Sequence, residues 1–519
     1  MVGVMTKMEV AVGDRVQVGE DRGTVLYVGP VPPTKGTWLG IDWDDPLRGK
    51  HNGVYDGTRY FQARYETSGS LVRLEKVQSE QSIISAIQER YGGTGQIMDS
   101  KELEEIQRAI NAPLFMMVGF DKVSEMQSSF DTLSVVGLRE HRISNAGDPG
   151  QLEKMCSNIV ELDLSKNLFK SWLNVYDITL QLPKLKFLDL SENRLTYKDC
   201  NPTDLKDGFS NLEFLVLSKV EYSWEDILNC AVMWPNIERF QISFNKITSL
   251  SIPPSGILQN LKILNIEGNN ISHWSEIEKL GTLPRLEILN ASNTGITHIS
   301  LATPNTLFAS LKYILISGNF INNWESISEL DKLPQLEELR LRNNPVLDGI
   351  SRETVRQIII ARIAKLKHLN SQEVSDEERR GAEIDYLKHN GRMWLETAID
   401  PKGRRVFNTL HPRYRALVQK YGEMEESELT NEKVALKANL VRIRIESKDK
   451  AVIEKQVPVE MSIRAFVFLA QRLFHIASAK LLLTLISSKN PLLKIELDNM
   501  MKTLSYYCVE DGDTVKVDW

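Results

Sequence analysis

The chain has 519 residues, of which 42% are apolar and 25% charged, and its formal net charge is −6. This composition is typical of globular protein, and the length predicts several domains, since one domain usually has ~100–150 residues. The acidic balance argues against nucleic acid as the main partner. Neither a signal-peptide pattern nor a run of about 18 apolar residues occurs, so we expect no membrane contact.

The cysteines indicate the compartment. There are four, Cys156, Cys200, Cys230 and Cys508, and no two form a CxxC pair. A disulfide framework or a zinc site is therefore not expected, and a reducing compartment is the natural location. We predict a cytoplasmic protein.

Residues 8–78 are rich in Gly, Pro, Val and aromatic residues, in short stretches such as VGDRVQV, RGTVLYVG, WLGIDWD and SLVRLEKV. Short strands separated by turn residues predict a small, mostly antiparallel β domain. Residues 79–135 are expected to be a linker. Within it, SEQSIISAIQERYGGTGQ predicts one short helix that ends at the glycines.

The middle of the chain, residues 136–395, is a repeat. The pattern LxxLxLxxN recurs about every 25 residues, and its last position is occupied in turn by Asn167, Asn193, Val220, Asn245, Asn269, Thr294, Asn319 and Asn344. This period predicts a leucine-rich repeat solenoid in which the Asn side chains hold the turns after the strands. Val220 and Thr294 cannot do this equally well, so we expect less regular turns there.

Tryptophan marks every second repeat, at Trp172, Trp224, Trp274 and Trp324. Each opens a segment with the apolar spacing of a short helix, whereas the intervening repeats are too rich in Pro and Thr. We therefore predict a convex side that alternates helix with irregular chain, with each Trp packed at the start of its helix.

The residues between the buried leucines of each strand point to the concave face of such a solenoid. Many of them are apolar, which favours a protein interface. The alternatives are that flanking loops cover these residues or that neighbours pack as a simple ladder. The predicted interface consists of Phe187, Phe214, Val216, Ile263, Ile288, Tyr313 and Leu315.

After the last repeat, ETVRQIIIARIAKLKHLN predicts an apolar-faced helix that covers the open end of the core. A second linker is expected over residues 396–435. Residues 436–519 alternate like strands in LVRIRIES, LLLTLIS and DTVKVDW, around a helical pattern in SIRAFVFLAQRLFHI. We predict an α+β module.

The first domain resembles a CAP-Gly domain, on the stretches WLGIDWD at 38–44, GKHNG at 49–53 and GTRYF at 57–61. His51 and Asn52 depart from the usual GKNDG. The resemblance implies a groove that holds the acidic-aromatic C-terminal tail of α-tubulin. Gly49 and Gly53 allow close backbone approach, Lys50 supplies charge, and free backbone N–H groups could capture a carboxylate. The expected tail-binding residues are Trp38, Trp43, Gly49, Lys50, His51, Asn52, Gly53 and Phe61.

The C-terminal module resembles a ubiquitin-like domain, with DGDTVKV near its end as the clearest match. It lacks the Gly-Gly tail of a modifier, so we expect a fixed interaction module. The order CAP-Gly, leucine-rich repeats, ubiquitin-like is similar to that of one family of tubulin-folding chaperones. The resemblance implies binding of α-tubulin and the αβ-tubulin dimer, dimer assembly, dissociation of the dimer with cofactor B, and action with cofactors C and D at the cytoskeleton.

No catalytic motif is found in the sequence: HExxH, GxSxG and a complete phosphate loop are all absent. We therefore expect no enzyme and no cofactor. One alternative is a microtubule-associated CAP-Gly adaptor, but the absence of sustained heptads favours a monomeric chaperone. Another is a scaffold that links tubulin to the proteasome through the ubiquitin-like end.

Overall fold

The computed structural model describes residues 10–92, 130–301, 306–425, 428–429, 440–447, 450–458, 461–474, 481–488, 494–500, 502–507 and 509–518. The chain divides into two compact units. The first consists of Met1–Tyr386 and Arg405–Leu417, and the second of Leu387–Arg404 and Val418–Trp519. Both are α/β structures, as the sequence predicts.

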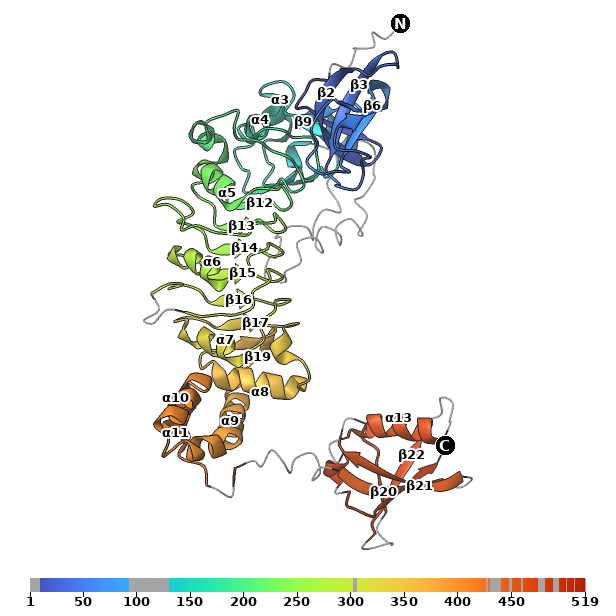
Figure 1. The fold of residues 1–519 in the computed structure, drawn as a ribbon, viewed down its shortest axis with the longest axis vertical. Helices are drawn as coiled ribbons and strands as arrows, with labels where there is room; N and C mark the ends of the chain where they lie inside the picture. Colours follow the sequence, from blue (N-terminus) through green and yellow to red (C-terminus); the bar gives the residue numbers. More distant parts are fainter. Residues whose placement is uncertain are drawn as a thin grey trace. The chain divides into compact units, whose positions relative to one another are not determined.

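The first unit begins with a small β domain (Figure 1). Its four-stranded antiparallel sheet has the order β1-β2-β3-β6, and a short hairpin, β4-β5, lies in the loop before β6. Val16, Val25, Leu39, Ile41, Trp43 and Val77 form its core. The bounds are β1 Arg15–Val18, β2 Asp21–Pro30, β3 Thr37–Trp43, β4 Val54–Tyr55, β5 Thr58–Arg59 and β6 Gly69–Arg73.

The segment after this domain is built into the repeats, so the predicted linker over 79–135 is wrong in its first part. Strand β7 (Gln81–Ser82) pairs in parallel with β9 (Ile143–Asn145). Helix α1 (Ile83–Tyr91) follows, capped by the Ser82 side chain and ended at Gly92 as predicted. Its residues Ile83, Ile84, Ala86 and Ile87 are buried in the core of the solenoid. The other part of this prediction, residues 93–129, lies outside the described residues.

The repeats stack into one eleven-stranded sheet, parallel from β8 to β18, with β19 antiparallel at its end. The middle residue of each repeat strand is fully buried because it faces the interior: Leu162, Leu188, Leu215, Phe240, Leu264, Leu289, Ile314 and Leu339. The bounds are β8 Val135–Gly137, β10 Glu161–Asp163, β11 Phe187–Asp189, β12 Phe214–Val216, β13 Arg239–Gln241, β14 Ile263–Asn265, β15 Ile288–Asn290, β16 Tyr313–Leu315, β17 Glu338–Arg340, β18 His368–Leu369 and β19 Gln372–Glu373.

Buried asparagines hold the turns after the strands. Asn245 is typical: its Nδ2 donates to the carbonyl oxygens of Leu217 and Ile242, at 2.7 and 3.0 Å. Where the repeat has Val220, the next asparagine satisfies the turn, because Asn245 Oδ1 accepts from the N–H groups of Val220 and Glu221. The same amide pattern occurs at Asn167, Asn193, Asn269, Asn319 and Asn344.

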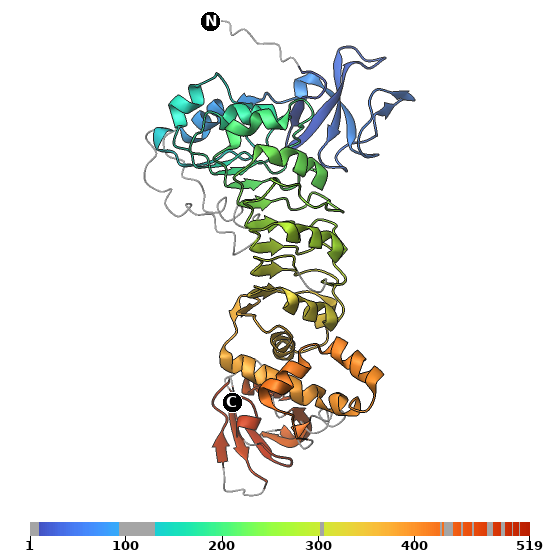
Figure 2. The same cartoon turned by 90° about the vertical axis from the view of Figure 1, so that its left-hand side faces the viewer.

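Short helices cover the side of the solenoid opposite the strands (Figures 1 and 2). As predicted, the four helices of alternate repeats each begin at a tryptophan, and three of these rings are buried. The intervening repeats have irregular chain or the 3-10 helix Pro202–Phe209. The bounds are α3 Gln151–Cys156, α4 Trp172–Thr179, α5 Trp224–Cys230, α6 Trp274–Glu278 and α7 Trp324–Glu329.

Helices close the end of the solenoid. Helix α8 (Arg352–Arg362) buries Ile359 and Ile360 in the core, as predicted for a cap. In the chain it is followed by α9 (Asp376–Glu396), α10 (Pro401–Leu410) and α11 (Tyr414–Tyr421). The predicted linker over 396–435 is therefore wrong for residues 401–421. The polar surface of these helices obscured the few buried anchors that fold them, such as Phe407 and Tyr414.

The C-terminal module has a five-stranded mixed sheet of order β21-β20-β24-β22-β23. Strands β20 and β24 pair in parallel, and α13 packs Ile463, Phe466 and Phe474 into the same core. This is a ubiquitin-like fold. Among the residues that the structure describes, no helix combines the length and apolarity needed to span a membrane. The bounds are β20 Leu440–Ser447, β21 Lys450–Pro458, α13 Ile463–Phe474, β22 Leu482–Ile486, β23 Lys494–Glu496 and β24 Thr514–Asp518.

Candidate functional site: the GKHNG loop and the concave face

The GKHNG loop is fixed against the start of β6. The backbone N–H groups of Lys50 and His51 both donate to the carbonyl oxygen of Gly69, at 2.7 and 3.2 Å, and Gly69 N–H donates back to His51 O at 2.8 Å. Gly53 N–H donates to His51 Nδ1 at 3.0 Å. These three loop N–H groups are thus already bonded. The expectation that they would capture a carboxylate is wrong for them, because the loop uses them to hold its own shape.

Both glycines of the loop are required by its geometry. A Cβ on Gly49 would lie 2.4 Å from Thr67 O and 2.5 Å from Gly69 O. Gly53 has φ +102°, and a Cβ there would lie 2.0 Å from Phe61 O. No other residue type fits either position without moving the backbone. The loop is therefore pressed onto two segments of the domain, and its shape is preformed.

The loop presents one free cation. Lys50 is exposed and makes no ion pair or hydrogen bond through its side chain in the described part of the chain. Beside it, burial and then the charge of Lys50 lower the pKa of His51. His51 is therefore neutral at neutral pH, and acceptance of the Gly53 N–H by Nδ1 leaves the ring proton on Nε2.

Asn52, where the CAP-Gly pattern has an aspartate, donates from Nδ2 to Glu66 Oε2 at 2.8 Å. An aspartate would place a second carboxylate against Glu66 instead. Asn52 therefore suits the neighbouring Glu66 better than an aspartate would. The asparagine also leaves less negative charge beside Lys50.

The predicted aromatic residues have different roles. Trp43 is 0% exposed and belongs to the domain core, so the prediction that it lines a groove is wrong: its neighbours in β3 alternate sides, and this ring points inward. Phe61 is 6% exposed and supports the loop from beneath, 6.0 Å from the His51 ring. Trp38 is half-buried, with the Arg73 guanidinium 4.1 Å above its ring.

Sequence reasoning missed three tyrosines near this loop. Tyr55 is 50% exposed and its ring centroid lies 6.4 Å from that of His51. Tyr27 and Tyr60 pack edge to face at 5.3 Å, and Tyr27 also covers Gly40 together with Phe61. Tyr60 lies within the GTRYF stretch, directly before Phe61, so the sequence could have indicated it. Tyr27 comes from β2, which only the fold brings here.

Ion pairs seat the β domain on the first repeats. The Arg64 guanidinium contacts the Glu221 carboxylate, which Arg194 also approaches at 3.2 Å. Lys170 Nζ lies 2.6 Å from Asp14 Oδ1. The Arg64–Glu221 and Lys170–Asp14 pairs join residues more than a hundred positions apart in sequence, so no local pattern could have indicated them. With β7 paired to β9, the β domain is attached to the solenoid through charge pairs and backbone hydrogen bonds together.

The predicted concave residues lie on one face of the sheet, at the first and third positions of their strands. Phe187 and Phe214 pack edge to face at 4.8 Å and form a small apolar cluster with Val216, separate from the main core. Ile288 and Leu315 are buried, whereas Ile263 and Tyr313 are half-buried. The partly open part of the stripe is thus at β14 and β16.

An acidic patch adjoins this stripe. Asp163 and Asp189 are register partners on β10 and β11, and each accepts a hydrogen bond from the backbone N–H two residues on, at Ser165 and Ser191. Burial, and then the charge of Asp163, raise the pKa of the Asp189 carboxyl. Asp163 is buried and Asp189 half-buried, and two such neighbouring carboxyls cannot both ionise without cost.

Comparison with known proteins identifies the class and then the family. Residues 12–77 match the CAP-Gly domain family, so this is a CAP-Gly protein with leucine-rich repeats and a ubiquitin-like end. Tubulin-specific chaperone E of Xenopus laevis is 41% identical over 97% of this chain and 98% of its own length, and that of Danio rerio is 39% identical over 99% of each. The chain belongs to the tubulin-specific chaperone E family.

Among solved structures, the C-terminal ubiquitin-like domain of mouse tubulin-specific chaperone e is 34% identical and covers 16% of this chain and 87% of that chain, with a TM-score of 0.15.

Proposed function

We propose that this protein is a tubulin-folding chaperone that holds α-tubulin at two places. The GKHNG loop holds the acidic-aromatic C-terminal tail, and the concave face holds the folded body. In this proposal it assists assembly of the αβ-tubulin dimer, dissociates the dimer together with cofactor B, and works with cofactors C and D. The observation that carries the proposal is the exposed, unpaired Lys50 on a preformed loop with aromatic rings around it.

The loop suits an acidic tail for electrostatic reasons. Lys50 supplies a compact charge that no carboxylate of the described residues neutralises, and Asn52 already satisfies Glu66. An incoming carboxylate would pair with Lys50 without displacing an existing partner. The terminal aromatic ring of the tail would pack against Tyr55 and His51, since face and edge contacts between rings add to apolar burial.

The concave face suits a larger body. Ile263 and Tyr313 are half-buried on the sheet, so they retain apolar surface for a partner to cover. The more deeply buried Phe187 and Phe214 would then act as the support of this surface and not as its contact points.

The two places form one binding unit. The β domain is joined to the solenoid through Gln78–Ser82 and the ion pairs of Arg64 and Lys170, with little free chain between them. A tail and a body held by a fixed pair of sites bind together more tightly than either alone, because the second contact forms at a high effective concentration.

The tail contact is tested with Lys50→Ala and a matched control, Lys76→Ala, an exposed lysine on the 3-10 helix Leu74–Lys76 of the same domain. Binding of an α-tubulin tail peptide to the full chain is measured by calorimetry. Loss of Lys50 should weaken binding about 5- to 30-fold, as for one charge-assisted contact, and loss of Lys76 should not. Equal affinities for the two variants would refute the tail role of the loop.

The body contact is tested with Tyr313→Asp. The control is Phe320→Asp, which changes an aromatic ring that is 62% exposed but lies outside the strands. Affinity for tail-less α-tubulin should fall in the first variant only. An equal fall in both would remove the concave face from the proposal.

The chaperone activity is tested by mixing the full chain with native αβ-tubulin, with and without cofactor B, and separating the products by size. An α-tubulin complex without β-tubulin supports the proposal. If the dimer stays whole and the chain instead sediments with microtubules, the adaptor alternative is correct. Binding of the chain to proteasome subunits would favour the degradation scaffold.

A further inference from the structure

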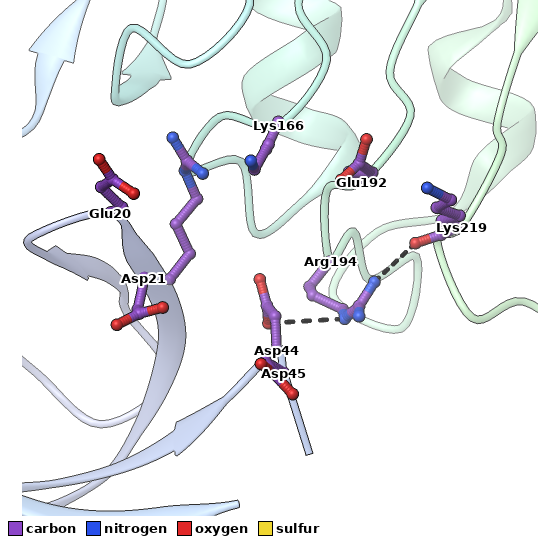
Figure 3. A pocket seen from close by; sticks show the side chains of 9 residues that line it. Glu20, Asp21, Asp44, Asp45, Lys166, Glu192, Arg194 and Lys219 are labelled. Atoms are coloured by element: carbon purple, nitrogen blue, oxygen red, sulfur yellow. Dashed lines mark hydrogen bonds and ion pairs between the residues drawn. The ribbon is translucent and has the colours of Figure 1, made fainter. Parts of the chain in front are cut away.

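A charged cleft lies between the β domain and the first repeats, apart from the GKHNG loop and the concave face (Figure 3). Its volume is about 320 Å³. The β domain contributes one wall, from the β1–β2 turn and the end of β3, and the turns after β10, β11 and β12 contribute the other. The lining residues are Glu20, Asp21, Arg22, Asp44, Asp45, Lys166, Glu192, Arg194 and Lys219.

Arg22 is unusual in this cleft because it is largely buried and has no partner for its charge in the part of the chain that the structure describes. Its side chain is carried by β2 and the residue is only 5% exposed, yet it makes no hydrogen bond or ion pair through its guanidinium with any described residue. Its Nε is buried without a partner. Burial lowers the pKa of Arg22, and the nearby carboxylates of Glu140 and Asp44 only partly oppose this. Burying Nε without an acceptor is unfavourable, and the charge of Arg22 lacks a counterpart in the cleft that this residue lines.

The carboxylates of the wall do not supply that counterpart, because most have partners of their own. Asp44 accepts from Arg15 at 2.8 Å, and Asp21 is paired with Arg48. Glu192 accepts from Arg139 at 2.7 Å, and Asp45 accepts from the backbone N–H of Leu47 at 2.9 Å. Glu20 remains, but it is exposed to water and forms no ion pair with Arg22.

A second guanidinium from the other wall faces the same space. Arg194 has a buried Nε without a hydrogen-bond partner, 3.7 Å from Asp44 Oδ1, and its Nη2 lies 3.2 Å from Glu221 Oε1; burial lowers its pKa. Its Nη1 donates to the backbone carbonyl oxygen of Lys219 at 2.8 Å (Figure 3), and Lys219 also lines the cleft. Lys166 lies on the same wall but is paired with Glu140 at 2.5 Å.

We propose that this cleft is a binding site for a small oxyanion, with Arg22 as its central donor and with Lys219 and Arg194 supplying positive charge from the repeats. The guanidinium fork matches the geometry of phosphate and carboxylate oxygens. The oxyanion bridges the β domain and the solenoid and so strengthens their attachment. Free phosphate and an acidic side chain of a bound protein share this chemistry. The site does not depend on tail binding at Lys50.

The test uses the full chain, inorganic phosphate and a short oligoglutamate peptide, with chloride at equal ionic strength as the reference. Phosphate or the peptide should bind by calorimetry and raise the melting temperature. Arg22→Met should weaken that binding about 10- to 100-fold, as expected for loss of charge-assisted hydrogen bonds. The control is Arg285→Met, which removes an exposed arginine of the repeats whose Nη1 donates to Asn260.

The melting temperature without the oxyanion gives a second, independent test. Arg22→Met replaces an unpaired buried charge by an apolar side chain, so in chloride it should melt at the same temperature as the unaltered chain or higher. Arg22→Lys keeps the charge but loses the fork, and its affinity should be intermediate. Response to phosphate alone, or to the peptide alone, identifies which source the site takes. No binding of either, or binding that Arg22→Met leaves unchanged, would overturn the proposal.

Discussion

Gly53 offers the sharpest test of how the GKHNG loop is held, because the chain contains a matched control. Gly53 has φ +102° and lies against Phe61, whereas Gly57 has φ +72° with nothing within 4 Å of a Cβ. An alanine at either position adopts a left-handed conformation, which raises the free energy of the folded state by about 1–2 kcal/mol. Only at Gly53 does the methyl group also collide with the backbone, 2.0 Å from Phe61 O.

The size of the extra effect follows from the bonds that the collision breaks. Relief requires the loop to move away from Phe61, which opens the hydrogen bonds from Tyr60 N–H to Gly53 O and from Ala63 N–H to Asn52 O, each 3.0 Å long. At about 1 kcal/mol for each bond, Gly53→Ala should destabilise the loop by about 3–4 kcal/mol in total. Gly57→Ala should remain at about 1–2 kcal/mol.

The assay is amide hydrogen exchange of the Tyr60 and Ala63 N–H groups in the full chain, since exchange reports local opening in a protein with several domains. Relative to Gly57→Ala, Gly53→Ala should speed their exchange about 10- to 100-fold, at tenfold for each 1.4 kcal/mol. Affinity for the tail peptide should fall in parallel. Exchange rates that agree within a factor of two would refute the reasoning, because the contact with Phe61 would then not hold the loop.

Three further predictions concern the repeats and their attachment. Asn245→Ala should destabilise the solenoid by about 2–4 kcal/mol because it leaves the N–H groups of Val220 and Glu221 and the Leu217 carbonyl without a partner, while Ile242 O keeps its bond from Asn269; an effect below 1 kcal/mol in urea unfolding would contradict the asparagine ladder. Burial and Asp163 raise the pKa of Asp189 to about 7, so the unfolded chain loses this proton first and stability falls as pH rises from about 4 to 7. Asp189→Asn should then be more stable than the unaltered chain at pH 8, with little difference at pH 4, and a difference independent of pH would exclude the ionisation. Glu221→Gln removes a carboxylate shared by three cations, Arg64 among them, and should broaden the distance distribution between spin labels on the β domain and the repeats, as should 1 M salt acting on the unaltered chain.

The repeats were predictable because their signal is local and redundant. Each strand has a buried apolar residue at the same position, such as Leu264, and the asparagine after it bonds both its own turn and that of the preceding repeat. The helix starts at Trp172 and its counterparts follow from the same periodicity. A single irregular residue such as Val220 does not erase a pattern that neighbouring repeats restate.

The parts that sequence reasoning missed are those that depend on contacts between distant segments. Helix α1 has only nine residues, too few to show that Ile83 and Ile87 belong to the core of the solenoid. Trp43 stands in a strand whose inward side is set by the whole sheet. The pairing of Arg64 with Glu221, and the unpaired state of Arg22, arise only when the β domain meets the repeats.

Because the β domain is attached to the solenoid, only the C-terminal tail of α-tubulin can adjust its length in the proposed complex. Because β7 pairs with β9, the separation between the two binding places is set by the fold and cannot contract to suit a short tail. An extended tail spans at most ~3.3–3.6 Å per residue, so a tail shortened below the required span would lose one contact outright. Lengthening it would weaken binding only slowly, since the entropy of a loop grows with the logarithm of its length. The proposed complex would therefore discriminate against α-tubulin with a tail too short to reach both places and would tolerate longer tails.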